Sequence, residues 1–244
     1  MTPKITLADV SPLAVNSTNI VVLVFWLSSF LLFRKRYQDA KVRVLFLLSQ
    51  AIAVAMLFPL AYPSPLVPPF VLLLLKFGSY FAIAPLLLHF VLLFPSPMEN
   101  ILSHARWLFG LLYGSIPVAL LGWMFVGRLG WQIGASYHFL LALTAIVIML
   151  YKYHRRTNLD DRRRLRVVVF GSLMAGIPPM FLYMLPASFG LTPLLPEWLT
   201  SLFLVIAAFS YLYATTRHNL FGVDQLLNRT LVYTILSLGI FALY

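Results

Sequence analysis

Long apolar runs alternate with short polar segments along the whole chain. Eight apolar runs can be marked, at about 13–33, 42–62, 69–94, 106–126, 133–151, 166–185, 196–216 and 230–244. A helix needs about 20 residues to cross a hydrocarbon core about 30 Å thick, so the first seven runs are long enough. The eighth has only fifteen residues before the sequence stops at Tyr244. We therefore predict an all-α bundle of about eight transmembrane helices with a truncated last span.

The composition agrees with this arrangement. Apolar residues make up 61% of the 244 positions and charged residues 10%, whereas soluble domains have about 45–50% and about 25%. The formal net charge is +11, which in a soluble protein would suggest nucleic acid as a partner. The sequence contains no cysteine, which excludes disulfides and thiolate metal sites within it.

The basic residues are confined to alternate loops. The loop after the first run, RKRYQDAKVR, holds five, and the loop after the fifth run, KYHRRTNLDDRRRLR, holds seven, including Lys152. With Arg106, Arg217 and Arg229, fifteen of the eighteen basic residues lie on one side. The positive-inside rule places that side in the cytoplasm and the N-terminus outside. The expected partner of these charges is therefore the anionic inner leaflet of a bilayer, and no nucleic acid.

The outer loops are short and rich in proline, as in YPSPLVPP and ASFGLTPLLP. Neither is long enough to form a domain. A stimulus would therefore be met inside the helix bundle, in the lipid, or at the shallow outer rim of the protein.

The third run carries the residues that most suggest a pocket. Lys76 is the one clear ionisable residue deep in a predicted span, and a charge within a membrane helix is costly and therefore functional by default. The run is also long enough for Lys76 to reach the outer interface, so both interpretations stay open. Pro85 predicts a kink, and His89 either packs through a hydrogen bond or contributes to a site. With Tyr80, these three residues form the candidate pocket.

No catalytic group, cofactor site or metal site is predicted. The five histidines show no i,i+4 pairing of the kind that holds a metal ion on one helix face. Gly110 and Gly114 give one GxxxG pattern, which permits close helix approach but is weak evidence for dimerisation.

A segment of mixed character, RHNLFGVDQLLNRTLVY, follows the seventh run. Its apolar residues can share one face and its charged residues the other, which suits an element lying along the inner membrane surface. We predict three parts: a seven-helix membrane bundle at 1–216, an amphipathic cytoplasmic connector at 217–229, and the start of the truncated eighth span at 230–244. The candidate signal-coupling residues of the connector are Arg217, Phe221, Asp224 and Arg229.

This segment resembles a block in the multi-pass N-terminal membrane region of bacterial sensor histidine kinases, Y-a-x-x-R-x-x-L-F-D-[IV]-D-x-[LV]-[IL]-x-R-T-L-V-Y. The matching residues are Tyr213, Ala214, Arg217, Leu220, Phe221, Val223, Asp224, Leu226, Leu227, Arg229, Thr230, Leu231, Val232 and Tyr233. HFVLLFP at 89–95 and DDRRRLRVVVFG at 160–171 resemble two further blocks of that region, in the same order. One departure is Gly222, where the family usually has an acidic residue.

The resemblance implies a multi-pass protein of the bacterial inner membrane that passes a signal to a cytoplasmic histidine kinase. Its partners would be a second copy, joined through the cytoplasmic region as a homodimer, and a response regulator. The kinase apparatus is absent from this sequence, because no histidine is followed by Glu and no Gly-rich ATP-lid motif occurs. The same membrane region can precede a phosphatase or a cyclase. A small-molecule membrane transporter and a passive membrane anchor are the alternatives.

Reading the gene beyond the codon for Tyr244 tests this resemblance. The expected continuation is one or two further spans, an H-E-x-x-x-P helix and an ATP-lid domain. A phosphatase or cyclase domain there would keep the sensor role and change the output. A stop codon soon after the eighth run would contradict the kinase interpretation.

Overall fold

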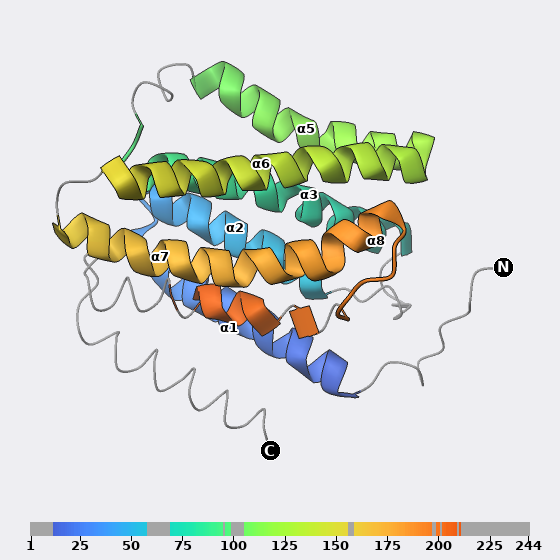
Figure 1. Cartoon of the computed structure of the whole chain (residues 1–244), viewed down its shortest axis with the longest axis horizontal. Coiled ribbons are helices and arrows are strands. Elements are labelled where there is room, and N and C mark those ends of the chain that lie inside the picture. Colours follow the sequence, from blue (N-terminus) through green and yellow to red (C-terminus); the bar gives the residue numbers. More distant parts are fainter. Residues whose placement is uncertain are drawn as a thin grey trace.

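The structure is a bundle of helices that run side by side along its long axis (Figure 1). This computed structural model describes residues 12–57, 69–94, 96–98, 105–155, 159–196, 199–200, 202–208 and 210. The elements are α1 (Pro12–Arg36), α2 (Ala40–Leu57), α3 (Pro69–Leu93), α5 (Ala105–Val126), α6 (Arg128–Arg155), α7 (Leu159–Pro178), the π-helix η2 (Pro179–Met184) and α8 (Leu185–Phe189). Residues 202–208 are helical as well. The predicted all-α class is confirmed for the described part of the chain, which contains no strand.

Four of the helical stretches are long and apolar enough to cross a membrane. They are Phe70–Leu93, Trp107–Val126, Arg128–Arg155 and Leu165–Ala187. They match the third to sixth apolar runs of the sequence, and they indicate a membrane protein. The first run is also helical, as α1, and the described part of the second is helical as α2. The seventh run is described only in part, and the eighth lies outside the described residues.

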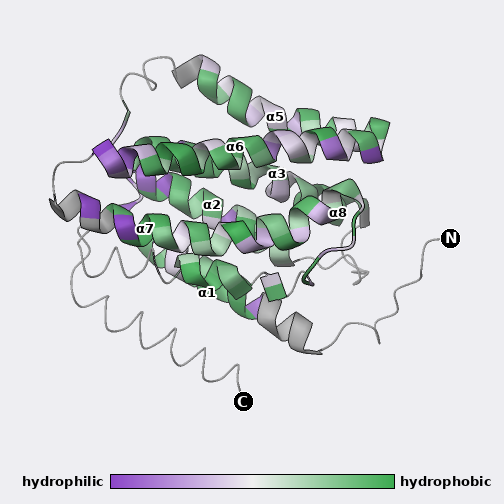
Figure 2. Ribbon diagram, viewed as in Figure 1, coloured by the Kyte–Doolittle hydropathy of each residue, from purple (hydrophilic) through white to green (hydrophobic). Residues whose placement is uncertain are grey.

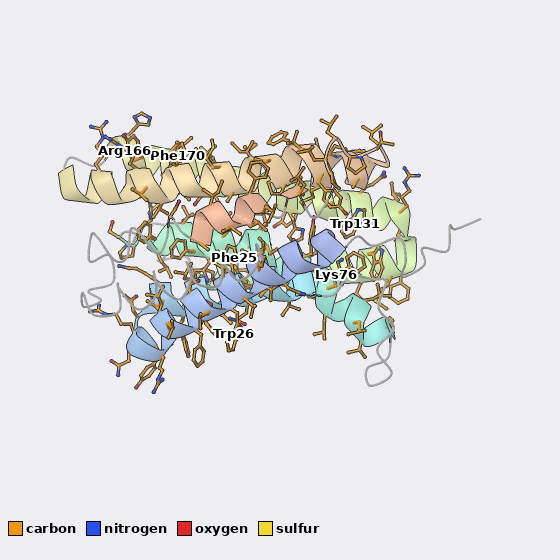
Figure 3. All side chains as sticks on the ribbon, turned by 90° about the horizontal axis from the view of Figure 1, so that it is seen from below. Phe25, Trp26, Lys76, Trp131, Arg166 and Phe170 are labelled. Atoms are coloured by element: carbon orange, nitrogen blue, oxygen red, sulfur yellow. The ribbon has the colours of Figure 1, made fainter. Side chains whose placement is uncertain are left out.

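Polar and charged residues gather at one end of the bundle. Figure 2 shows hydrophilic positions where α6 ends and α7 begins, and apolar positions along most of each helix between the ends. Figure 3 shows Arg166 toward this end, with Lys76 and Trp131 toward the other. At the charged end, the guanidinium of Arg162 lies 5.1 Å from the ring centre of Tyr153, and that of Arg155 lies 5.4 Å from the ring centre of Tyr151. Such cation–π contacts hold basic side chains against the helix surface at its rim.

The turn between α5 and α6 is a single residue. Gly127 has a φ of 64°, a left-handed conformation that glycine adopts without steric cost. Its N–H donates to Trp123 O at 3.0 Å, and its carbonyl accepts from the Trp131 N–H at 3.0 Å, so one helix follows the other directly. The sequence predicted an outer loop here with the next span starting at 133. The helix instead begins at Arg128.

The α5–α6 hairpin is held by two glycines that face each other. A Cβ atom added at Gly130 would overlap the backbone carbonyl of Gly122, so the two helix backbones touch. Gly110 and Gly114, which form the GxxxG pattern, have no neighbouring atom within 4 Å of an added Cβ. The close approach within the chain therefore uses Gly122 and Gly130, and the GxxxG pair takes no part in it.

Three prolines shape the region after α7. Pro178 and Pro179 have no N–H to donate, and the i to i+4 pattern gives way to the π-helix η2 immediately after them. Pro186 cannot donate an α-helical hydrogen bond to the carbonyl of Leu182, four residues earlier. That carbonyl accepts from the N–H groups of Leu194 at 2.9 Å and Leu195 at 3.4 Å. The chain after α8 therefore folds back onto the kinked helix to satisfy it.

We predict that Gly130→Ala weakens the α5–α6 hairpin, because the added methyl group forces the two backbones apart. Overpacking of this kind costs about 1–3 kcal/mol, to be measured as a lower unfolding temperature of the purified protein in detergent. Gly114→Ala is the matched control. It meets no neighbour and should stabilise the helix by about 0.5–1 kcal/mol. Equal effects of the two substitutions would contradict the close approach.

Candidate functional site: two apolar cavities and a buried lysine

Two adjacent cavities lie in the middle of the bundle. The first has a volume of about 140 Å³ and the second about 170 Å³. The first is lined by Phe25, Ser28, Ser29, Leu32, Leu45, Leu48, Ser49, Ile52, Ile83, Leu87, Ser172, Ala175, Gly176, Leu204, Ala207 and Ala208. The second is lined by Ile52, Met56, Tyr80, Ile83, Ala84, Leu87, His138, Phe139, Ala142, Ala175, Gly176, Pro179, Met180, Tyr183, Met184, Thr200 and Leu204. Six residues belong to both linings, namely Ile52, Ile83, Leu87, Ala175, Gly176 and Leu204.

Small residues in α7 and in residues 202–208 create this space. Ala175 and Gly176 form part of the wall between the cavities, and Ala207 and Ala208 line the first one. A Cβ added at Gly176 would have no neighbour within 4 Å. At Gly171, in contrast, an added Cβ would overlap the side chain of Ser210. The last described helix therefore touches α7 at Gly171 and is separated from it by a cavity next to Gly176.

The cavity walls are apolar, and their hydroxyl groups are already bonded. In the first cavity Ser28 donates to Phe25 O at 3.2 Å and Ser49 donates to Leu45 O at 2.9 Å. Ser29 donates to the carbonyl of Trp26 at 3.1 Å in the same way. No Asp, Glu, Lys or Arg is among the described residues that line either cavity. The space therefore suits an uncharged, mainly apolar molecule.

Lys152 is the most deeply buried basic residue among those described, with 5% of its surface exposed. Its Nζ atom lies 2.6 Å from Val91 O, 3.0 Å from Leu92 O, 2.9 Å from Phe94 O and 3.2 Å from Ser96 O. A charged lysine has three N–H donors, so this group of carbonyls is sufficient to engage all of them. Lys152 thereby joins the last turn of α6 to the end of α3.

The sequence explains why the end of α3 needs this donor. The last four carbonyls of any helix lack a partner within the helix. Here Val91 would normally accept from residue 95, but Pro95 has no N–H. A cation at a helix C-terminus is also favoured by the helix dipole. The sequence assigns Lys152 to the loop after the fifth run; the structure instead places it in the last turn of α6, which continues to Arg155 and turns Lys152 inward.

A second histidine, which the candidate pocket left out, lines the second cavity. His138 is 3% exposed, and its Nδ1 lies 2.7 Å from Gly134 O, one turn earlier in α6. Its Nε2 lies 3.5 Å from Ser115 Oγ of α5. Ser115 in turn donates to Leu112 O at 2.6 Å. The ring of His138 also packs at 4.9 Å from that of Phe81, so it links α3, α5 and α6.

The structure does not gather the four residues of the candidate pocket around one cavity. Tyr80 lines the second cavity, whereas the other three are absent from the linings of both. Pro85 is fully buried. His89 Nδ1 lies 2.6 Å from the hydroxyl oxygen of Tyr113, and its ring lies 4.2 Å from that of Phe109, so it packs α3 against α5.

Lys76 is half-buried and lies toward the end of the bundle that is opposite Arg166 (Figure 3). An aromatic cluster occupies the same end. Trp131 is at its centre, with ring centres 5.2 Å from Phe77, 6.1 Å from Tyr80 and 5.3 Å from Phe81. Aromatic clusters at a helix end are typical of the membrane interface.

The four candidate residues of the connector, Arg217, Phe221, Asp224 and Arg229, lie outside the described residues. No group of three or more His, Asp or Glu residues that could hold a metal ion occurs in the part of the chain that the structure describes. Comparison of the chain with family models, with curated proteins and with solved structures gives no match.

We predict that Lys152→Met lowers the stability of the protein, because it keeps the apolar stem and removes the donors from the end of α3. An unsatisfied buried acceptor costs about 1–3 kcal/mol, to be read from thermal unfolding in detergent. Lys152→Arg should recover part of the loss, since it keeps the charge at the helix C-terminus. The control is Lys76→Met, the same exchange at a half-buried lysine, which should cost less. An equal loss at Lys76 would show that Lys152 has no special structural role.

Proposed function

We propose that this chain is the membrane-embedded sensor region of a bacterial sensor histidine kinase of a two-component system. It would lie in the inner membrane and pass a signal through residues 217–229 to a cytoplasmic kinase module. The observation that carries the proposal is the position of the two cavities. Both are lined by α7 and by residues 202–208, the last helical segment described before that connector.

The segments that resemble the kinase family support this proposal by their roles in the fold. HFVLLFP, at 89–95, supplies three of the four carbonyls that Lys152 holds. DDRRRLRVVVFG, at 160–171, ends at Gly171, which contacts Ser210. These two segments therefore take part in close contacts between helices.

The proposed mechanism is a shift of the last helix relative to α7. A molecule that fits the cavities better in one arrangement than in another changes the population of the two arrangements. Gly171 and Ser210 provide a close contact about which such a movement can occur. Because the connector follows this helix in sequence, the movement would reach Asp224 and Arg229 and then the kinase.

In this proposal the charged end of the bundle faces the cytoplasm, where its basic residues contact anionic lipid. The chain has eight spans with its N-terminus outside, and the full protein is a homodimer joined through its cytoplasmic region, with a response regulator as its partner. The chain itself performs no catalysis.

Orientation can be tested directly, because the sequence has no cysteine. Tyr37 and Leu194 are 57% and 73% exposed and lie in different connecting segments. We expect a membrane-impermeant maleimide to label Leu194→Cys in intact cells and to label Tyr37→Cys only after the membrane is opened. Labelling in the reverse order would overturn the proposed orientation.

Substitution of the connector tests the signalling role. In the full-length protein, Asp224→Asn and Arg229→Gln should change autophosphorylation while the cysteine labelling pattern stays the same. Gln225→Asn, a conservative exchange in the same segment, is the control and should leave autophosphorylation unchanged. Altered labelling would show that the two charges are needed for insertion. Unchanged phosphorylation in both variants would favour a passive membrane anchor.

A further inference from the structure

We propose that the two adjacent cavities bind one uncharged, mainly apolar small molecule, and that Gly176 is the residue that keeps its site open. The binding itself does not depend on the signalling role. Its consequence for the last helix rests on the proposed function.

The size of the space supports a ligand with at least one ring. The two cavities have volumes of about 140 and 170 Å³ and share six lining residues. An apolar cavity of about 150 Å³ in another protein stays dry and binds benzene. Each cavity here therefore has room for a group the size of one aromatic ring, and a molecule with two such groups could occupy both.

The chemistry of the walls defines the class of ligand. A charged group would lose its hydration without gaining an ion-pair partner, because the described lining residues include no Asp, Glu, Lys or Arg. The hydroxyl groups of Ser28, Ser29 and Ser49 already donate to carbonyls of their own helices. Ser172, Tyr183 and Thr200 also have interactions of their own. The walls thus favour a ligand with few hydrogen-bonding groups.

The π-helix η2 adds an independent feature to this site. Pro179, Met180, Tyr183 and Met184, four residues of η2, line the second cavity. A π-helical turn inside an α-helical stretch occurs frequently at functional sites. Met180 and Met184 also have flexible, polarisable side chains that adapt to ligands of different shape. The deformed part of the helix and the cavity therefore coincide.

Gly176 offers a substitution that places a side chain in the site. It lines both cavities, and a Cβ there would meet nothing within 4 Å. Gly176→Leu should therefore occupy the space with its own side chain. Gly114→Leu is the matched control, because an added Cβ there also meets nothing and Gly114 is exposed and lines neither cavity.

The experiment uses a phenyl diazirine as a one-ring, uncharged probe, with the whole chain in lipid bilayers. Light expels N₂, and the carbene inserts into bonds of side chains in contact with the probe. Mass spectrometry then locates the labelled residues. Probe dissolved in lipid should label exposed positions such as Val118 and Phe125, which are 68% and 81% exposed. Ile52 and Ala175, which are 8% and 1% exposed and line both cavities, are reached mainly through the cavities.

We expect the wild-type chain to be labelled at Ile52 and Ala175. This labelling should be lost in Gly176→Leu and kept in Gly114→Leu, while Val118 is labelled in all three proteins. Ethylbenzene should compete with the probe, whereas the similarly shaped but charged benzylammonium should not. Absence of internal labelling in the wild type would overturn the proposal, and this includes the case in which a lipid chain already fills the space. Persistence of labelling in Gly176→Leu, or competition by benzylammonium, would overturn it as well.

A variant with a smaller side chain keeps the proposal testable if Gly176→Leu misfolds. If Gly176→Leu fails to reach the membrane, Gly176→Ala should still reduce internal labelling relative to Gly114→Ala. In the full-length protein, Gly176→Leu should also fix autophosphorylation at one level whatever the stimulus. Internal labelling with no effect on phosphorylation would uphold the binding site and contradict the proposed function. An effect on phosphorylation without internal labelling would contradict the binding site alone.

Discussion

Backbone carbonyls that proline leaves without a donor govern how this bundle is held together. In a bilayer no water is available to satisfy them, so each needs a partner from the protein. The carbonyl of Val91 accepts a hydrogen bond from Lys152 across the helix interface. The carbonyl of Leu182 accepts one from the backbone amide of Leu194. The first of these hydrogen bonds joins α6 to α3, and the second holds the chain after α8 against η2. The positions of proline in the sequence thus decide where distant segments must meet.

The sequence predicted the helical class and the regions of the described apolar helices, because these follow from hydrophobic length alone. The sequence places Lys152 in a loop, since a basic residue near the end of an apolar run gives the same pattern whether it faces lipid headgroups or a neighbouring helix. The sequence signal that could have corrected this placement is Pro95, because a proline there has no N–H to donate to a carbonyl at the end of α3. The sequence pattern could not show which helix would donate a hydrogen bond to that carbonyl.

The cavities could not be predicted from the sequence either, because they depend on which helices pack together. Gly176 in α7 and Ala207 in the later helical segment are ordinary residues in a membrane helix, and only packing shows that they leave space. Gly122 and Gly130 are equally ordinary in sequence, yet they allow two backbones to touch, and Gly171 leaves room for the side chain of Ser210. Small residues thus serve two opposite purposes here, and the neighbouring helix decides which one applies. Of the candidate pocket around Lys76, Tyr80 lines the second cavity, and an apolar space gives no charge pattern from which the rest of its lining could be predicted.

The π-helix makes part of the fold sensitive to the number of residues as well as to their identity. A π-helical turn holds one more residue than an α-helical turn. Deleting a single codon within Pro179–Met184 would let this stretch return to α-helical spacing with the following residues in nearly the same orientation, whereas inserting one would rotate them by about 100°. After such an insertion Phe189 would no longer present its carbonyl to Arg128, which now donates to it at 3.3 Å. Insertions in this stretch should therefore be tolerated far less well than the exchange of one apolar side chain for another.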